Sequence, residues 1–424
     1  MTIDAIAVSE SLEKATVRSW KTPISFAIFT FLAFIVFVLF AREDQTTFQL
    51  SPDNAAIKIP LISISPVLIG IIVTVLLSAA TVYAALRAQA ARKTPLWITA
   101  VFAFLFTLSF LAWAGSGSSL NITQLLVSSV ALSTPLIFGS LGGILSERAG
   151  VVNVAIEGQL LAGAFLAAIV SSVTGSPWAG LFAAGVGGML VSFILATFSI
   201  KYWVEQVIVG VVINVLVLGL TSFLYTAVLV KNTDTLNTAA RFGRWKVPGL
   251  SEIPVIGPVL FNQTVIVYVM YLAVFGVWFG LFHTKWGLRL RAVGEHPQAA
   301  DTVGIDVNRT RFWNVALAGA VAGAGGAYFT LDSVSHFGKD MTAGLGFIAL
   351  AAVIFGRWNP IRSTLAALLF GFAMSLQFVL GAISSGVPSE FLLMLPYVVT
   401  IFAVAGFVGH VRGPAASGKP YVKG

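Results

Sequence analysis

One carboxylate and two amides interrupt an apolar stretch of this sequence, and they are the first candidates for chemistry. The stretch runs from Ser146 to Phe165. After Glu147 and Arg148, which we expect at a span end, it carries Asn153, Glu157 and Gln159. A carboxylate inside a membrane is costly unless it faces protein or water, so it marks a candidate functional site. If the stretch is helical throughout, Asn153 and Glu157 share one face, because they are four residues apart.

Two interpretations of this pair stay open. In the first, Asn153 and Glu157 line a pathway for a polar solute. Gly150 and Gly158 favour a broken helix there, and broken helices expose backbone groups to cargo in transporters. In the second, Glu157 links two helices or caps a helix end. Asn214, in a later apolar stretch, is the third candidate pathway residue, although an inter-helix hydrogen bond also explains it.

No other group of polar residues has the spacing of a catalytic or metal site. The pattern G-x-x-x-x-G-K-[ST] is absent, so we do not expect ATP to bind here through a P-loop. Asp332, His336 and Asp340 follow no standard metal motif and are expected in a solvated loop. We therefore expect a protein that is not an enzyme and that holds no metal or cofactor of its own.

The composition indicates an all-α integral membrane protein. Of 424 residues, 57% are hydrophobic and 10% are charged, whereas soluble domains average about 25% charged residues. The absence of cysteine excludes disulfides and thiol chemistry. The net charge of +8 does not indicate nucleic-acid binding, because basic residues retained on the cytoplasmic side of a membrane explain it.

Apolar runs long enough to cross a bilayer recur along the chain, and we predict about twelve transmembrane helices, with a range of about 10–12. The predicted spans are 24–40, 62–86, 96–114, 122–145, 151–173, 178–200, 207–230, 265–282, 312–331, 343–355, 361–380 and 391–408. The span 343–355 is short and fits a half-helix, or a helix that its neighbours shield from lipid. Glycine clusters in several spans predict close helix–helix packing.

The distribution of Lys and Arg predicts that both termini are cytoplasmic. With all twelve spans crossing, 18 of the 25 basic residues fall on the side of the N-terminus, as the positive-inside rule requires. The exception is the external loop 231–263, which carries four of the others.

A polar loop from Lys285 to Asn314 stands out on the predicted cytoplasmic side. It carries five basic residues and a short helical piece that begins after Pro297 and ends at Gly304. A structured basic loop between two spans is a candidate contact for a soluble partner. We expect its arginines to lie at an anionic membrane surface.

Three segments resemble one known family of membrane proteins. They are E-R-A-G-V-V-N-V-A-I-E-G-Q (147–159), G-L-R-L-R-A-V-G-E-H-P-Q-A-A-D-T-V-G-I-D-V-N-R (287–309) and G-F-I-A-L-A-A-V-I-F-G-R-W-N-P (346–360). They resemble permease subunits of bacterial ABC importers of the branched-chain amino acid/ribose type, and most closely those for nucleosides or simple sugars. The resemblance implies a type II-like permease core at residues 120–410, after an N-terminal extension (1–119) with about three helices. A cytoplasmic tail follows at 411–424.

The resemblance also implies partners and a cargo. A permease of this type forms half of a pore in the bacterial cytoplasmic membrane, and a second, non-identical permease forms the other half. Separate ATPase subunits bind ATP and Mg²⁺, and an external substrate-binding lipoprotein delivers the cargo. The implied coupling helix, which seats in the ATPase, comprises Pro297, Gln298, Ala299, Ala300, Asp301, Thr302, Val303 and Gly304.

Two other functions fit parts of the sequence. A twelve-helix, proton-coupled secondary carrier would also suit the span count and the buried carboxylate, but the basic pattern expected after the second span of a major-facilitator protein is missing. An integral-membrane enzyme acting on lipid would need a polar cluster at a membrane face, which the sequence lacks. Asn153, Glu157 and Asn214 are the predicted pathway residues for a neutral cargo.

Overall fold

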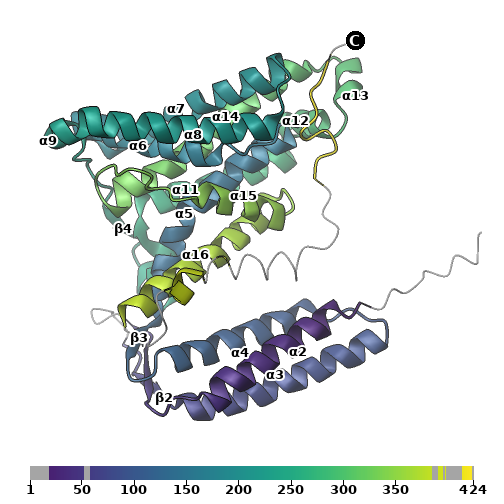
Figure 1. Cartoon of the computed structure of the whole chain (residues 1–424), viewed down its shortest axis with the longest axis vertical. Coiled ribbons are helices and arrows are strands. Elements are labelled where there is room, and N and C mark those ends of the chain that lie inside the picture. Colours follow the sequence, from purple (N-terminus) through teal and green to yellow (C-terminus); the bar gives the residue numbers. More distant parts are fainter. Residues whose placement is uncertain (1–18, 52–57, 384–389, 395–396, 398–412, 423–424) are drawn as a thin grey trace, which may run out of the picture. The chain divides into compact units, whose positions relative to one another are not determined.

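Helices dominate the computed structural model, which describes residues 19–51, 58–383, 390–394, 397 and 413–422 (Figure 1). The chain divides into two compact units. Unit 1 comprises Met1–Leu50, Ile59–Ile122 and Leu380–Leu392, and unit 2 comprises Ser51–Lys58, Thr123–Val379 and Leu393–Gly424.

Unit 1 contains three long helices and a small sheet. The helices are α2 (Lys21–Phe34), which continues as a π-helical turn (Ile35–Leu39), α3 (Pro66–Gln89) and α4 (Leu96–Ala114). The strands β1 (Thr46–Gln49), β2 (Ile62–Ile64) and β3 (Ser119–Asn121) form a sheet in the order β2-β1-β3. Strand β1 is antiparallel to β2 and parallel to β3. The stacked rings of Phe26 and Phe102 pack α2 against α4, with centroids 4.0 Å apart.

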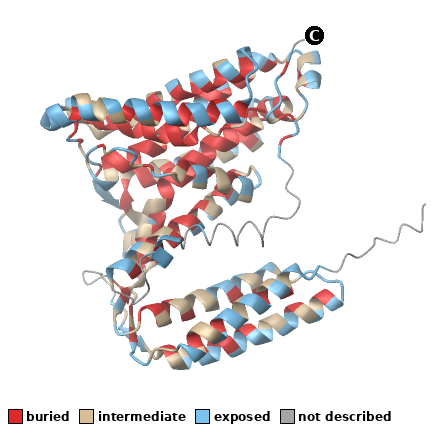
Figure 2. Cartoon of the chain, in the orientation of Figure 1, coloured by how far each residue is buried: buried red, intermediate tan, exposed pale blue. Residues whose placement is uncertain are grey.

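The helices of unit 1 bury little of their apolar surface. In their most apolar windows 22–28% of the residues are buried, against 78% in the long helices α5 and α14 of unit 2. Figure 2 shows the same contrast, because red buried residues fill α5 and α6 but alternate with exposed ones on α2 and α3. The exposed apolar side chains of unit 1 are suited to contact with lipid or with another membrane helix.

Unit 2 holds the remaining elements. In chain order they are α5 (Ile122–Arg148), α6 (Ile156–Thr174), α7 (Pro177–Ala196) with a π-helical end (Thr197–Lys201), α8 (Gln206–Leu224) with a π-helical end (Tyr225–Leu229), a 3-10 turn (Val230–Asn232), α9 (Thr233–Leu236), β4 (Arg244–Lys246), a 3-10 turn (Leu250–Glu252), α10 (Ile256–Phe261), β5 (Asn262–Thr264), α11 (Val265–His283), α12 (Lys285–Glu295), α13 (Pro297–Thr302), α14 (Val307–Tyr328) with a π-helical end (Phe329–Ser333), α15 (Leu345–Phe355) and α16 (Pro360–Ala382). Strands β4 and β5 pair antiparallel.

Helices α6, α7 and α14 form the centre of unit 2 through glycine contacts. A Cβ atom on Gly163 of α6 would lie 2.1 Å from the carbonyl oxygen of Gly323 on α14, and one on Gly188 of α7 would lie 2.1 Å from that of Gly319. No side chain fits at such distances, so the backbones themselves are in contact. The predicted close packing of the glycine-rich spans is confirmed.

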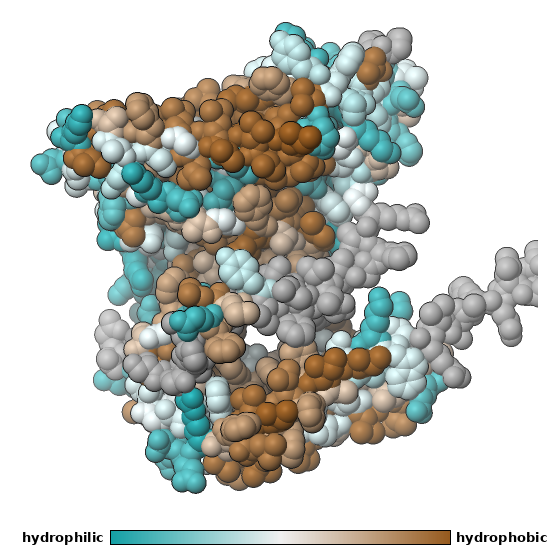
Figure 3. All heavy atoms as spheres, viewed as in Figure 1, coloured by the Kyte–Doolittle hydropathy of each residue, from teal (hydrophilic) through white to brown (hydrophobic). Residues whose placement is uncertain are grey.

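Ten helices among the described residues are long and apolar enough to cross a membrane, which lies within the predicted range. In unit 2 the apolar surface forms a band over α7 and α8, between hydrophilic ends near α9 and near α12–α13 (Figure 3). One predicted boundary was wrong, because the span 151–173 becomes helical only at Ile156. The span 343–355, predicted to be short, is the 11-residue helix α15. Most of the predicted span 391–408 lies outside the described residues.

Candidate translocation and coupling site

The carboxylate of Glu157 caps the beginning of α15. Its Oε1 atom accepts hydrogen bonds from the Thr342 hydroxyl (2.5 Å) and the Gly344 backbone N–H (2.9 Å), and its Oε2 atom accepts one from the Gly346 N–H (2.6 Å). The first backbone N–H groups of a helix have no partner within the helix. A negative charge there also interacts favourably with the helix dipole. Glu157, which is 9% exposed, therefore holds α15 onto α6.

The beginnings of α6 and α15 are in contact because Gly346, at the point where the two helices cross, has no side chain. A Cβ atom on Gly346 would lie 2.4 Å from the backbone nitrogen of Glu157. Helix α15 has 11 residues and is about 16 Å long at 1.5 Å per residue, roughly half of a hydrocarbon core of about 30 Å. A helix of this length does not cross such a core alone, and its other end leads into the turn before α16.

The segment before α6 is held by side chains rather than by helical hydrogen bonds. Asn153 and Gln159 exchange two amide hydrogen bonds (3.1 and 3.2 Å), and Gln159 also donates to the Ser192 hydroxyl (2.8 Å). Asn214 accepts from the Gly158 N–H and donates to the Val154 carbonyl, both at 2.9 Å. These side chains fix the break at which α6 begins.

The predicted shared helix face of Asn153 and Glu157 is wrong. Asn153 precedes the helix, and Glu157 lies in its first turn. All three predicted pathway residues lie in one region, around the beginnings of α6 and α15, but their polar atoms are bonded to protein. Their predicted contact with cargo stays a prediction.

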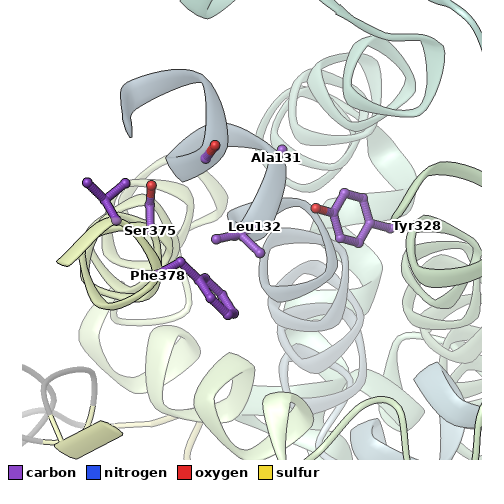
Figure 4. Close-up of a pocket in the computed structure, with 7 residues that line it drawn as sticks. Ala131, Leu132, Tyr328, Ser375 and Phe378 are labelled. Carbon is purple, nitrogen blue, oxygen red and sulfur yellow. The ribbon is translucent and has the colours of Figure 1, made fainter. Parts of the chain in front are cut away.

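A cavity of about 250 Å³ opens between α5, α14 and α16. Its lining residues are Ser128, Ala131, Leu132, Tyr328, Ser375, Phe378 and Val379. In Figure 4 the ring of Tyr328 enters from α14 with its hydroxyl directed toward Leu132, and Ser375 and Phe378 project from α16. Tyr328 is 6% exposed, and its hydroxyl has no hydrogen-bond partner among the described residues, whereas Ser375 donates to the Leu125 carbonyl. A cavity with a free hydroxyl and aromatic walls can hold a small neutral solute.

The short helix predicted after Pro297 is present as α13, and its coupling role stays a prediction. It begins at Pro297, and Gly304 follows with a left-handed backbone (φ +84°) that ends it. Ala300 faces inward and packs with Val293 and Val307. Gln298, Ala299, Thr302, Val303 and Gly304 are exposed. Val303 is 75% exposed, which is unusual for an apolar side chain and suits contact with a partner.

Helix α12 is fixed to the end of α5. A Cβ atom on Gly294 would lie 2.0 Å from the carbonyl oxygen of Arg148. The guanidinium of Arg148 also lies 3.6 Å from the carboxylate of Glu295. These contacts join the α12–α13 segment to the end of α5, next to the segment that leads into α6.

The C-terminal tail, residues 413–422, packs against helices α12 and α13. The N–H of Ala416 donates to the carbonyl of Gly294 (2.9 Å), and the ring of Tyr421 packs with Ala300. The pKa of Tyr421 is raised, first by desolvation and then by its hydrogen bond to the Asp301 carboxyl group and the charge there.

Arg311 departs from the prediction that the loop arginines lie at the membrane surface. It is 2% exposed, and its Nη1 atom donates to the Lys419 carbonyl (2.9 Å). It therefore links α14 to the tail.

Sequence reasoning missed several residues of this region. Thr342 and Gly344 carry no signal of their own, because their partner is Glu157, far away in the chain. Tyr328 and Phe378 look like ordinary span residues. The aromatic residue at the end of a polar tail, Tyr421, is a signal that could have been used.

Comparison with known proteins gives one family and several relatives. The model of the family described as "Branched-chain amino acid transport system / permease component" matches residues 125–404. The guanosine ABC transporter permease protein NupQ of Bacillus subtilis is 40% identical over 306 residues, which are 70% of this chain and 96% of that protein. The nucleoside ABC transporter permease protein NupC of Lactococcus lactis is 40% identical over 313 residues, 72% of this chain and 98% of that protein. A putative glucose ABC transporter permease protein, TsgC13 of Haloferax volcanii, is 38% identical over 257 residues, 60% of this chain and 76% of that protein. No solved structure matches the chain.

Proposed function

The chain belongs to the branched-chain amino acid transport system permease family, and on this premise we propose that it carries a nucleoside across the cytoplasmic membrane. It is a permease subunit of an ABC importer, a transport component rather than an enzyme. The observation that carries the cargo proposal is the 40% identity to guanosine and nucleoside permeases over nearly their whole lengths. A proton-coupled carrier is not favoured by this membership.

The cavity between α5, α14 and α16 supports this cargo. Its volume of about 250 Å³ suits a small solute. The free hydroxyl of Tyr328 can donate to a base or ribose oxygen, and the ring of Phe378 can pack against a base. Glu157, Asn153 and Asn214 then act by positioning: they hold the broken beginning of α6 and the half-helix α15 beside the pathway.

Helix α13 is the proposed seat for an ATPase subunit. Its exposed side, from Gln298 to Gly304, meets the ATPase, and Ala300 anchors it from within. When ATP binding draws two ATPase subunits together, α13 follows, and the contact of α12 with α5 passes the motion to the spans as a rigid-body movement. A second permease, non-identical to this chain, supplies the other half of the pore, and an external lipoprotein delivers the nucleoside.

The coupling role is tested by Val303→Ser, with Val204→Ser as the matched control in the exposed loop before α8. Burial of one valine stabilises an interface by about 1.5 kcal/mol, so Val303→Ser weakens association with the ATPase by about tenfold. The measurement is binding of purified ATPase to the permease in nanodiscs, together with guanosine uptake. Equal ATPase binding by both variants would contradict the role of α13.

The cargo is tested by Tyr328→Phe, with Tyr271→Phe as the control. The buried hydroxyl of Tyr271 lacks a hydrogen-bond partner among the described residues, and Tyr271 lies outside the cavity. Loss of one hydrogen bond to cargo lowers uptake about two- to tenfold in Tyr328→Phe alone, with no loss of stability. Uptake of labelled guanosine, competed by other nucleosides and by glucose, is the assay. Competition by glucose but not by nucleosides would refute the cargo proposal.

A further inference from the structure

A groove of about 460 Å³ lies where α12 meets the first turns of α14. Its lining combines basic, aromatic and apolar side chains: Trp286 and Arg289 from α12, and Arg309, Thr310, Trp313, Asn314 and Leu317 from α14. The α12–α13 segment carries the basic loop that the Lys and Arg distribution assigns to the cytoplasm. The groove thus lies at the cytoplasmic end of a span.

The two arginines of the groove carry uncompensated charge. In the part of the chain that the structure describes, neither guanidinium lies within ion-pair distance of a carboxylate, and Arg148–Glu295 is the ion pair found there. The nearby Asp306 accepts the backbone N–H of Arg309 as the cap of α14 (2.9 Å). Two unpaired guanidinium groups on one groove favour an anion, and a phosphate can take two parallel hydrogen bonds from each.

The aromatic walls of the groove are held in place by their neighbours. The ring of Trp286 lies over Gly280, where a Cβ atom would come within 2.9 Å of it. Trp313 packs edge-to-face with Phe312 (5.8 Å between centroids) and with Phe193 (6.3 Å). Trp313 and Leu317 are nonetheless 57% and 40% exposed. They extend the groove along α14 as an apolar strip.

We propose that this groove binds an anionic phospholipid of the cytoplasmic leaflet. Arg289 and Arg309 hold the phosphate, the two tryptophans lie at the level of the headgroup, where this residue type is enriched, and Leu317 contacts the first methylene groups of an acyl chain. Basic pockets between spans on the cytoplasmic side bind anionic headgroups in this way. A free phosphate would use the arginines and leave the apolar strip in water. The lipid joins α12 to α14, the two helices that flank α13.

The test is site-mapped crosslinking of the full chain, assembled with its partner subunits in nanodiscs of phosphatidylglycerol and phosphatidylcholine. A trace of phosphatidylglycerol carries a diazirine beside its headgroup, and mass spectrometry locates labelled peptides. We expect label on α12 and α14, displaced by unlabelled phosphatidylglycerol but not by phosphatidylcholine or by free glycerol phosphate. In Arg289→Gln/Arg309→Gln the half-saturating fraction of phosphatidylglycerol rises about thirtyfold, at about 1 kcal/mol per basic residue and 1.4 kcal/mol per factor of ten.

The control is Lys201→Gln/Arg362→Gln, which removes two exposed charges outside the groove and leaves labelling unchanged. Equal displacement by phosphatidylcholine would overturn the proposal, because the groove would then be only apolar. Displacement by glycerol phosphate would make it an anion site without a lipid. Absence of label from the assembled complex would mean that another protein covers the groove. Size-exclusion chromatography of each variant confirms assembly, so a loss of label reports binding.

Discussion

Replacing Glu157 by Gln removes the charge from the cap of α15 while preserving its shape. A carboxylate accepts at both oxygens, but an amide presents one oxygen and one NH₂ group. If the amide nitrogen faces Gly346, the backbone N–H of Gly346 loses its acceptor. If the amide nitrogen faces Gly344, the backbone N–H of Gly344 loses its acceptor. In either orientation one buried backbone donor is left unsatisfied.

The expected loss of stability follows from two contributions. An unsatisfied buried donor costs about 1–3 kcal/mol. Loss of the carboxylate charge from the helix beginning adds about 0.3–1 kcal/mol. Together Glu157→Gln lowers the free energy of unfolding by roughly 1–4 kcal/mol. Its matched control is Glu205→Gln, because Glu205 caps α8 through the N–H groups of Val207 and Ile208 but is exposed to solvent. Water can replace that cap, and the control costs about 1 kcal/mol or less.

The assay is unfolding of the purified chain in mixed micelles of rising SDS fraction, followed by tryptophan fluorescence, with guanosine uptake measured in parallel. Equal losses in the two variants would refute the capping argument. Wild-type stability with abolished uptake would assign Glu157 to the cargo instead. Wild-type stability together with wild-type uptake would exclude a role for the charge of Glu157.

Three further outcomes follow from the same geometry. Gly346→Ala places a methyl group 2.4 Å from the backbone of Glu157 and lowers the yield of folded protein severalfold in detergent. The control Gly219→Ala, where nothing lies within 4 Å, leaves the yield unchanged. Equal yields of the two variants would contradict the contact of α15 with α6. A double-mutant cycle of Asn153→Ala and Gln159→Ala gives a coupling energy of about 0.5–3 kcal/mol, and additive losses of stability would show that the amide pair does not act as a unit. Tyr421→Ala raises hydrogen exchange in α13 without changing exchange in α5; unchanged exchange in α13 would mean that the tail does not seat it.

Signals in the nearby sequence predicted those elements whose structure depends mainly on their own residues. The spans followed from apolar length, and α13 followed from Pro297 at its beginning and Gly304 at its end, since both residues act on their own backbone. The close packing of α7 and α14 followed from the glycine clusters of the two spans, because small residues permit close approach.

Gly150 and Gly158 favoured a break in the stretch from Ser146 to Phe165, but its position before Ile156 could not be predicted, because distant residues stabilise it. The N–H of Val152 donates to the side chain of Gln206 (2.7 Å), and the carbonyl of Val154 accepts from Asn214. These bonds replace helical ones across more than fifty residues of sequence. A prediction from neighbouring residues alone therefore continues the helix from residue 151 and places Glu157 too deep in that helix. Its true partner, α15, lies about 190 residues further along.

The C-terminal tail also has a consequence for biogenesis. Its residues leave the ribosome after every segment that they contact, so α13 stays without Tyr421, and Arg311 of α14 without Lys419, until the tail has been made. A chain truncated before residue 413 would present the proposed ATPase contact on an α13 that lacks its packing with Tyr421. The contact proposed between α13 and an ATPase subunit would therefore meet a supported helix only once the tail is in place.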